Sequence, residues 1–327
     1  MTNSALLTDH TARLARARLA LDGLSVGDAL GETCFLPENW NALIEDSRAT
    51  ARGPWPYTDD TTMALAIFEV LGEFGRIDQD ALAQRFAARY RAAPWRGYGA
   101  GAHRLLAQIL GGTDWRVAAA AVFRGGSFGN GSAMRIAPLA AYFAEDGYEK
   151  VAEQAALASA VTHAHAEGIA GGIAVAVAGA YAWLNRSRRG AEPVKRGLFD
   201  AVLAHTPVSE VRQGIERAGA FAFDLSVEPS VRLLDYGMQT VSFDMSVEKV
   251  VRQLGNGSRI SCQDTVPFCL WIAARYLDDY RSAVVQTIRA GGDIDTNAAI
   301  VGGVVALAVQ ADGIPPEWLA DREELVV

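Results

Sequence analysis

Apolar residues recur every three or four positions along most of the chain, which is the spacing of an α-helix with one buried face. Alanine is abundant in these stretches and supports helix through its intrinsic propensity. Alternating β-branched runs, the pattern of a strand, are scarce. The sequence therefore indicates an all-α fold. The predicted helices cover residues 5–24, 61–74, 79–92, 133–144, 148–160, 168–184, 265–277 and 298–310.

The connections between these helices are short and punctuated by glycine and proline. None of them is long enough to be an obvious linker between domains. A chain of 327 residues could form one large domain or two ordinary ones. We predict one domain over residues 1–327, a single compact orthogonal helical bundle whose loops gather at one end.

The segment 168–184 contains no charged residue and invites comparison with a membrane span. It is shorter than the roughly 20 residues that a span requires. Glycine and alanine dominate it, where a span would be rich in leucine and phenylalanine. We predict a buried helix whose small residues let neighbouring backbones come close, and no membrane association.

Half of the residues are hydrophobic, and the net charge is −8 at pH 7. This charge argues against a general nucleic-acid binder, which needs excess cations to displace phosphate counterions. One basic cluster is interpreted as a solvated loop, with docking of an acidic partner as the alternative. It consists of Arg186, Arg188, Arg189, Lys195 and Arg196.

The three cysteines make a poor disulfide framework and suit a reducing compartment. Cys262 and Cys269 stand seven residues apart, a spacing that favours one buried face of a helix. The amino terminus lacks the basic-then-apolar pattern of a secretory signal. We expect a cytoplasmic protein.

Two acidic segments lie far apart in the chain, and each precedes an apolar helical stretch. The first contains Thr58, Asp59 and Asp60, and the second contains Asp293 and Asp295. Helix capping explains either segment alone, but it leaves surplus carboxylates at both. Gathered in one pocket, these carboxylates would repel one another unless a cation neutralised them. Oxygen donors of this kind favour Mg²⁺, Mn²⁺ or Ca²⁺ over zinc.

A glycine-rich segment over residues 125–135 precedes another apolar stretch. Its backbone N–H groups and the following helix start could hold a phosphate or pyrophosphate. The segment matches neither the dinucleotide-binding fingerprint nor the P-loop. On its own, a glycine-rich turn between two helices is an equally good interpretation.

Taken together, these segments resemble the ADP-ribosylglycohydrolase family, whose bacterial members include the dinitrogenase reductase-activating glycohydrolases. The resemblance covers nearly the whole chain in order. It runs through Gly27-Asp28-Ala29-Leu30-Gly31, Thr58-Asp59-Asp60-Thr61, Gly126-Ser127-Phe128-Gly129-Asn130-Gly131 with Ala133-Met134-Arg135, Thr162-His163, and Gly292-Asp293-Ile294-Asp295-Thr296.

The resemblance implies an all-helical fold with a loop-built dinuclear metal site that holds two divalent ions, Mg²⁺ or Mn²⁺. The implied metal ligands are Thr58, Asp59, Asp60, Asp293, Asp295 and Thr296. The implied ligand-binding residues for the diphosphate and distal ribose are Gly126, Ser127, Phe128, Gly129, Asn130 and Gly131, with Met134 and His163 beside them.

Two residues near these motifs also have structural interpretations. His163 could be a histidine satisfied by hydrogen bonds near a helix start. Asp28 is interpreted as a polar residue that fixes a loop between Gly27 and Gly31, outside the metal set.

The chain departs from the family pattern at two positions. Ile294 stands between the last two aspartates, where many members have threonine. Phe35 stands where many members place a glutamate, four residues after Gly31, that often contacts the substrate or the attacking water. Glu32 could substitute for that glutamate, or it could be an exposed loop carboxylate.

The resemblance implies a metal-dependent hydrolase that removes ADP-ribose from a modified protein side chain. The cleaved bond lies at the anomeric carbon of the distal ribose; arginine is the first guess for the side chain, with serine and threonine as alternatives. Asp60 and Glu32 are candidate bases, and Asp295 is a further candidate catalytic residue. The rival hypotheses are a non-catalytic ADP-ribose-binding protein, a hydrolase of another nucleotide glycoside, and a plain helical scaffold.

Overall fold

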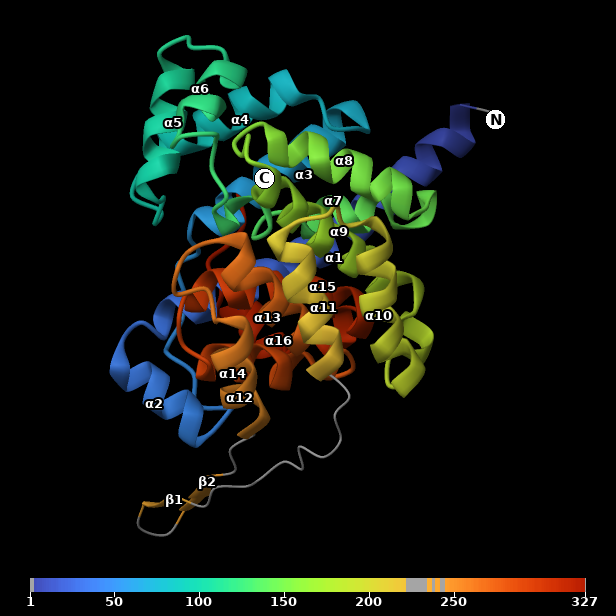
Figure 1. Cartoon of the computed structure of the whole chain (residues 1–327). Helices are drawn as coiled ribbons and strands as arrows, with labels where there is room; N and C mark the ends of the chain where they lie inside the picture. Colours follow the sequence, from blue (N-terminus) through green and yellow to red (C-terminus); the bar gives the residue numbers. More distant parts are fainter. Residues whose placement is uncertain (1–2, 222–233, 237–238, 242–244, 327) are drawn as a thin grey trace.

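The computed structural model describes residues 3–221, 234–236, 239–241 and 245–326. Within these residues the chain forms sixteen α-helices, four short 3-10 helices and two short strands (Figure 1). The helices are α1 (Asn3–Thr33), α2 (Pro37–Glu45), α3 (Asp59–Phe74), α4 (Gln79–Ala92), α5 (Ala100–Leu110), α6 (Trp115–Ala121), α7 (Ala137–Phe143), α8 (Tyr148–Ala160), α9 (Ala166–Leu184), α10 (Glu192–His205), α11 (Glu210–Phe221), α12 (Met245–Leu254), α13 (Cys262–Arg275), α14 (Tyr280–Arg289), α15 (Ile294–Val309) and α16 (Pro316–Asp321). Strands β1 (Leu234–Tyr236) and β2 (Gln239–Val241) pair antiparallel. The all-α prediction is confirmed.

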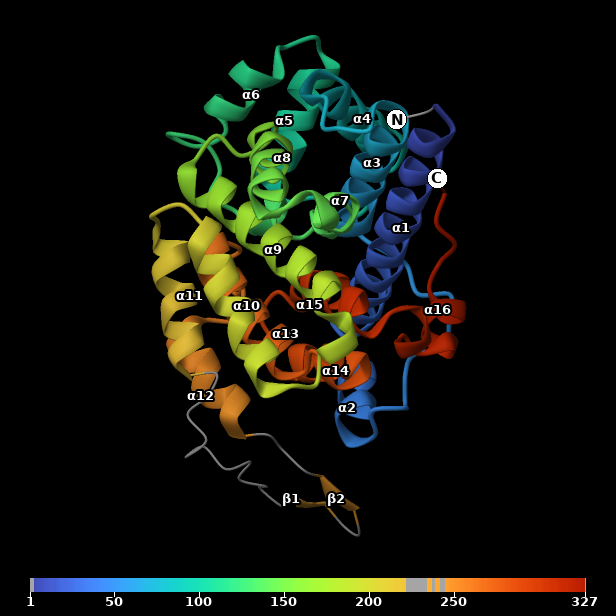
Figure 2. The same cartoon turned by 90° about the vertical axis from the view of Figure 1, so that its right-hand side faces the viewer.

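Helices α9 and α15 run through the middle of the molecule, and α1 extends from the surface into the middle, beside α15 (Figure 1). Helices α4, α5 and α6 lie at one end, and α10 to α14 lie at the other (Figures 1 and 2). The residues of α15 are almost all buried, from Ile294 to Val309. A helix that is apolar all round belongs in the interior, and α15 is the central helix against which α1, α9, α13 and α14 pack.

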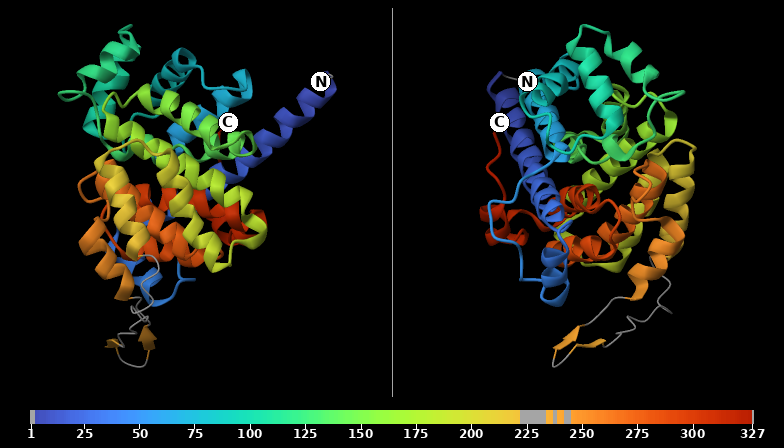
Figure 3. Two further views of the ribbon diagram at one scale, coloured as in Figure 1. Left: turned by 45° about the vertical axis from the view of Figure 1, so that its right-hand side comes forward. Right: turned by 90° about the vertical axis from the view of Figure 1, so that its left-hand side faces the viewer.

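Three glycines on α1 allow it to lie directly against α15 (Figure 3). A Cβ atom at Gly27 would stand 2.1 Å from the carbonyl oxygen of Ala298, and one at Gly31 would stand 2.7 Å from Cα of Asp295. At Gly23 a Cβ would meet Gly302 O at 2.6 Å. No side chain larger than hydrogen fits at these positions. The spacing of four residues puts the three glycines on one face of α1.

The prediction of a helix that ends near residue 24 is wrong, because α1 continues to Thr33. Glycine lowers helix propensity, and the glycines at positions 23, 27 and 31 are the reason why the sequence prediction ended this helix at residue 24. The contact with α15 outweighs that preference. Asp28 consequently lies in a helix and not in the loop that the sequence suggested.

The uncharged segment 168–184 lies in helix α9, which is buried from Gly168 to Ala182 at most positions. By length and composition α9 could cross a membrane, but 78% of its most apolar window is buried inside the structure. Cys262 and Cys269 are both buried and free, as is Cys34. The predictions of a buried helix and of a shared core position for the two cysteines of α13 are confirmed.

The remaining helix predictions vary in accuracy. Those for α4 and α8 agree with the structure at both ends, and those for α3, α9, α13 and α15 differ by a few residues. The prediction of a helix over residues 133–144 is wrong at its start, because α7 begins only at Ala137. A 3-10 turn over Asn130–Ser132 precedes it. Helices α2, α5, α6, α10, α11, α12, α14 and α16 were not predicted.

Substitution of Gly27 by alanine should lower the free energy of unfolding by more than about 2 kcal/mol, because the new methyl group meets backbone and cannot be relieved by a rotamer change. Gly72→Ala on α3 is the matched control, since its nearest neighbour would be Leu14 Cδ2 at 4.0 Å. That change should stabilise by about 0.5–1 kcal/mol. Urea unfolding of both variants measures the difference. Equal stability of the two variants would refute the close α1–α15 contact.

Candidate active site

Three helix ends bring acidic residues from distant parts of the sequence together. Asp60 lies in the first turn of α3, Asp295 in the first turn of α15, and Asp28 one turn before the end of α1. One carboxylate oxygen from each lies within 4.8 Å of the others. These three aspartates and the neighbouring Asp59 and Asp293 are called the acid cluster. The amino-terminal ends of α3 and α15 both face this acid cluster, so their dipoles partly offset its charge.

Asp28 fixes the start of α3. Its Oδ2 accepts hydrogen bonds from the backbone N–H groups of Thr58 at 3.0 Å and Thr61 at 3.1 Å, and from Thr61 Oγ1 at 2.5 Å. The structural role that the sequence suggested is therefore present, although it acts on a helix start. Asp28 also belongs to the acid cluster, which the sequence analysis did not anticipate.

Burial raises the pKa of every carboxyl group in this cluster. It raises the pKa of Asp28 to about 6 and, together with the charge of Asp28, that of Asp59 to about 7. The pKa values of Asp60 and Asp295 also lie well above the ordinary value, first through burial and then through the neighbouring aspartates. The ionised cluster is thus unfavourable without added positive charge.

Several oxygen atoms of the acid cluster have no protein partner or share one. Oδ1 of Asp60 and Oδ1 of Asp295 are buried and have no hydrogen bond to any residue that the structure describes. Thr58 Oγ1 lies 2.8 Å from Asp28 Oδ1 and 2.9 Å from Asp60 Oδ2, yet a hydroxyl carries one proton. The donors are all hard oxygens. This set fits a divalent cation such as Mg²⁺ or Mn²⁺.

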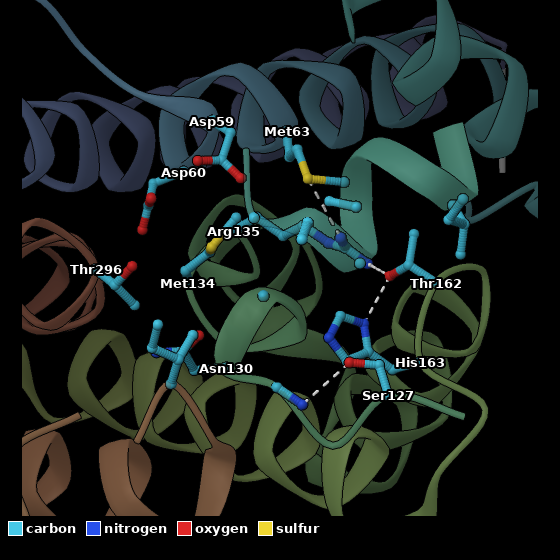
Figure 4. A pocket seen from close by; sticks show the side chains of 18 of the residues that line it. Asp59, Asp60, Met63, Ser127, Asn130, Met134, Arg135, Thr162, His163 and Thr296 are labelled. Atoms are coloured by element: carbon cyan, nitrogen blue, oxygen red, sulfur yellow. Dashed lines mark hydrogen bonds between the residues drawn. The ribbon is translucent and has the colours of Figure 1, made fainter. Parts of the chain in front are cut away.

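The acid cluster borders a cavity of about 500 Å³ (Figure 4). Asp59, Asp60, Asp293, Asp295 and Thr296 line one side. The structure therefore brings the two acidic segments together, as the sequence predicted. Thr58 is buried behind them as the N-cap of α3.

The glycine-rich segment lines another side of the same cavity. Its lining residues are Ser127, Phe128, Gly129, Asn130, Gly131, Met134 and Arg135, and His163 lies beyond them. Ser127 Oγ accepts from Gly129 N at 3.1 Å. Gly126 is not among the lining residues; it packs against the backbone of Ala164 and His165, which leaves no room for a Cβ.

Asn130 connects the glycine-rich segment to the acid cluster. Its Nδ2 donates to Asp293 Oδ2 at 2.6 Å and to Thr265 Oγ1 at 3.0 Å. This amide lowers the pKa of Asp293, although burial is the larger effect and raises it. The loop and the carboxylates are thus held in a fixed relation.

Glu32 and Phe35 lie at the carboxyl-terminal end of α1. Glu32 is partly buried in the last helical turn, and burial raises its pKa. Its charge also raises the pKa of Asp295, which places it beside the acid cluster, although it does not line the cavity. The interpretation of Glu32 as an exposed loop carboxylate is therefore wrong. Phe35 is 50% exposed.

Much of the cavity wall is formed by residues that were not predicted as site residues from the sequence. Helix α5 and the residues before it form one side, including Gly99, Leu105 and Leu106. Phe123 and Ile260 line the cavity with exposed side chains and backbone φ angles of 60° and 51°. These values are uncommon for non-glycine residues and are typical of functional sites. No local sequence signal marks them.

Comparison with known proteins agrees with this arrangement. The sequence profile of the ADP-ribosylglycohydrolase family matches residues 9–326. The chain is 30% identical to human ADP-ribosylhydrolase ARH3, covering 80% of this chain and 73% of the relative. It is also 30% identical to the mouse ADP-ribosylhydrolase ARH3, covering 93% and 86%. A solved structure titled "ADP-ribosylglycohydrolase-related protein complex" shares the fold, with a TM-score of 0.61, 22% identity, and coverage of 96% and 94%.

Metal-free protein should melt at a higher temperature at about pH 5.5 than at about pH 8. In the folded chain Asp59 and Asp28 take up protons near pH 7 and 6, above their ordinary value of 3.8. Between the ordinary value of 3.8 and about pH 7, the folded form therefore binds more protons than the unfolded form. The free energy of unfolding then falls as the pH rises. Differential scanning calorimetry after EDTA treatment measures this slope.

Saturating Mg²⁺ should reduce this pH dependence by restoring stability at the higher pH, because a cation replaces the protons. Asp60→Asn removes one negative charge and should also reduce the dependence of the melting temperature on pH in the metal-free protein. Asp312→Asn, an exposed change in the last 3-10 turn, is the control. A metal-free melting temperature that stays constant or rises with pH would contradict the electrostatic account of the cluster.

Proposed function

This chain belongs to the ADP-ribosylglycohydrolase family, and we propose that it hydrolyses ADP-ribose from a modified protein side chain at the anomeric carbon of the distal ribose. One observation carries the proposal: the acid cluster and the glycine-rich segment border a single cavity and are joined by the Asn130–Asp293 hydrogen bond. A diphosphate in the loop then leaves the sugar beside the carboxylates.

Two divalent ions, Mg²⁺ or Mn²⁺, complete the proposed site. The residues that would hold them are Thr58, Asp59, Asp60, Asp293, Asp295 and Thr296, with Asp28 added on the basis of its place in the acid cluster. When bound, such ions orient ribose hydroxyls and lower the pKa of a coordinated water. The unpartnered oxygens of Asp60 and Asp295 support this assignment.

The chain's own residues bind and orient the rest of the ligand. Backbone N–H groups of the segment 127–131, which lines the cavity, suit the diphosphate. The exposed rings of Phe123 and Phe128 offer aromatic contacts to an adenine ring, and the exposed side chain of Ile260 adds an apolar contact beside them. The carboxylates favour positive charge that develops on the sugar as the side chain departs.

Glu32 is the first candidate for the base that removes a proton from the attacking water. Burial raises its pKa, which is the direction expected of a general base. Asp60 is only 1% exposed and is also one of the residues that would hold the metal ions. Asp60 and Asp295 remain the alternatives.

The negative charge around the site favours a cationic leaving group, so arginine is our first choice for the modified side chain, with serine and threonine next. A non-catalytic ADP-ribose-binding protein is the second candidate function, because Phe35 occupies the position where many family members have a glutamate. We also propose a cytoplasmic location, which suits three free buried cysteines.

Asp295→Ala, or EDTA added to the unaltered protein, should abolish release of ADP-ribose while the helical circular dichroism persists. Glu32→Gln should lower kcat by roughly 100-fold or more with little change in ADP-ribose affinity. Glu38→Gln on the exposed first turn of α2 is the control for Glu32. Undiminished kcat in Glu32→Gln would remove Glu32 from the catalytic role.

The linkage is tested with peptides that carry ADP-ribose on arginine, serine or threonine, each with Mg²⁺ and with Mn²⁺. Release from the arginine peptide is the expected result. Release from serine or threonine only would keep the hydrolase and change its substrate. Tight ADP-ribose binding without release from any peptide would favour the binding protein, and no binding at all would overturn both.

A further inference from the structure

Arg135 is a buried cation whose hydrogen bonds go to neutral groups. Its side chain is 1% exposed and lines the cavity across from the acid cluster (Figure 4). Nη2 donates to Thr162 Oγ1 at 2.6 Å and to Ala158 O at 3.3 Å, and Nη1 lies 3.6 Å from Met63 Sδ. The guanidinium also stacks on the Phe86 ring at 4.4 Å, and Nε has no hydrogen bond.

Such a placement is unfavourable for stability alone. Burial lowers the pKa of Arg135 to about 9, and the charge of Asp59 only partly offsets this. A buried charge without a carboxylate in direct contact lacks the compensation that usually accompanies it. The guanidinium therefore calls for a role besides packing.

The hydrogen bond from Arg135 continues to His163. Thr162 Oγ1 lies 2.7 Å from His163 Nδ1, and the dashed lines in Figure 4 trace both contacts. A guanidinium can only donate, so Thr162 Oγ1 accepts from Arg135. The hydroxyl proton then has the Nδ1 lone pair as its acceptor among the contacts described. If Nδ1 carried the proton instead, Oγ1 would accept from both neighbours and its own buried proton would have no acceptor among these contacts, so the arrangement favours the Nε2–H tautomer of His163.

Nε2 of His163 faces the glycine-rich segment. It would stand 3.4 Å from a Cβ at Gly131 and 3.8 Å from one at Gly129. Within the described part of the chain, no hydrogen bond to Nε2 is found, and His163 lines the cavity. Burial also lowers the pKa of His163 to about 3, so the ring is neutral at physiological pH.

We propose that Arg135 and Thr162 are positioning residues that lock His163 as the neutral Nε2–H tautomer and aim this N–H at the segment 126–131, where the diphosphate of the ligand binds. The role of His163 in ligand binding rests on the proposed function, because that function supplies the ligand. The tautomer of His163 can be measured without any ligand and does not depend on the proposed function. Without the Arg135–Thr162 contact, the hydroxyl can turn its proton away from Nδ1 and accept from Nδ1–H. Nε2 then presents a lone pair that repels a phosphate oxygen.

The test uses the full chain labelled with ¹⁵N-histidine, and His163→Gln assigns the His163 signals among the five histidines. Nitrogen chemical shifts report the tautomer without ligand, metal or turnover. The unaltered protein should show the Nε2–H form. Thr162→Val keeps the shape of the side chain and removes the hydroxyl, so it should shift His163 toward a mixture of tautomers.

Calorimetric titration with ADP-ribose in the presence of Mg²⁺ supplies the second readout. Thr162→Val and Arg135→Lys should each weaken binding by about tenfold, the effect of one hydrogen-bond donor. Arg16→Lys is the control, because Arg16 is also buried, donates to Ala141 O, and does not line the cavity. It should leave both readouts unchanged.

An Nδ1–H tautomer in the unaltered protein would overturn the proposal, as would unchanged nitrogen shifts in Thr162→Val. Unchanged ADP-ribose affinity in that variant would overturn the binding role. If Arg135→Lys fails to fold, Thr162→Val decides alone. Failure of the proposed function is separate, since it would appear as an unaltered protein that neither binds nor releases ADP-ribose.

Discussion

Mutual repulsion among buried carboxylates is the constraint on which this structure depends. Asp28, Asp60 and Asp295 come from three helices and have oxygens within 4.8 Å of one another. Asp59 and Asp293 stand at the edge of the same site. Only Arg135 and Arg259 carry positive charge among the described residues that line the cavity. The fold therefore concentrates negative charge where its own side chains do not neutralise it, and this points to bound cations.

The close contact between α1 and α15 holds these charges in place. Gly27 and Gly31 let the two backbones meet, and Asp28 and Asp295 are neighbours of these contacts. Asp28 in turn fixes the first turn of α3 through Thr58 and Thr61. The packing of the core therefore keeps these carboxylates close together, although their mutual repulsion favours separation. Asn130 extends the same rigidity to the glycine-rich segment.

The sequence predicted the features that have a local signal. Helical periodicity identified α3, α4, α8 and α9, and surplus carboxylates at two helix starts identified the acidic segments. The end of α1 was missed, because the glycines that weaken a helix in isolation are required by its neighbour. For the same reason Asp28 was left out of the cluster. These outcomes depend on tertiary contacts that no window of sequence contains.

The rest of the cavity was equally inaccessible from sequence. Phe123 and Ile260 line the wall with backbones at positive φ angles, a conformation that no sequence pattern indicates for these residues. Arg135 was visible in a motif, but its buried contact with Thr162 depends on how α8 packs against the segment after the glycine loop. Glu32 became a better candidate base once α1 was seen to extend past it. The family resemblance supplied roles, and the structure supplied the relations between them.

The most direct test of the central claim is an anomalous difference map from crystals grown with Mn²⁺ and ADP-ribose. The account predicts manganese peaks within coordination distance of Asp60 and Asp295, with the distal ribose beside them and the diphosphate against residues 126–131. Ordered ADP-ribose in the cavity with no metal peak at the acid cluster would contradict it.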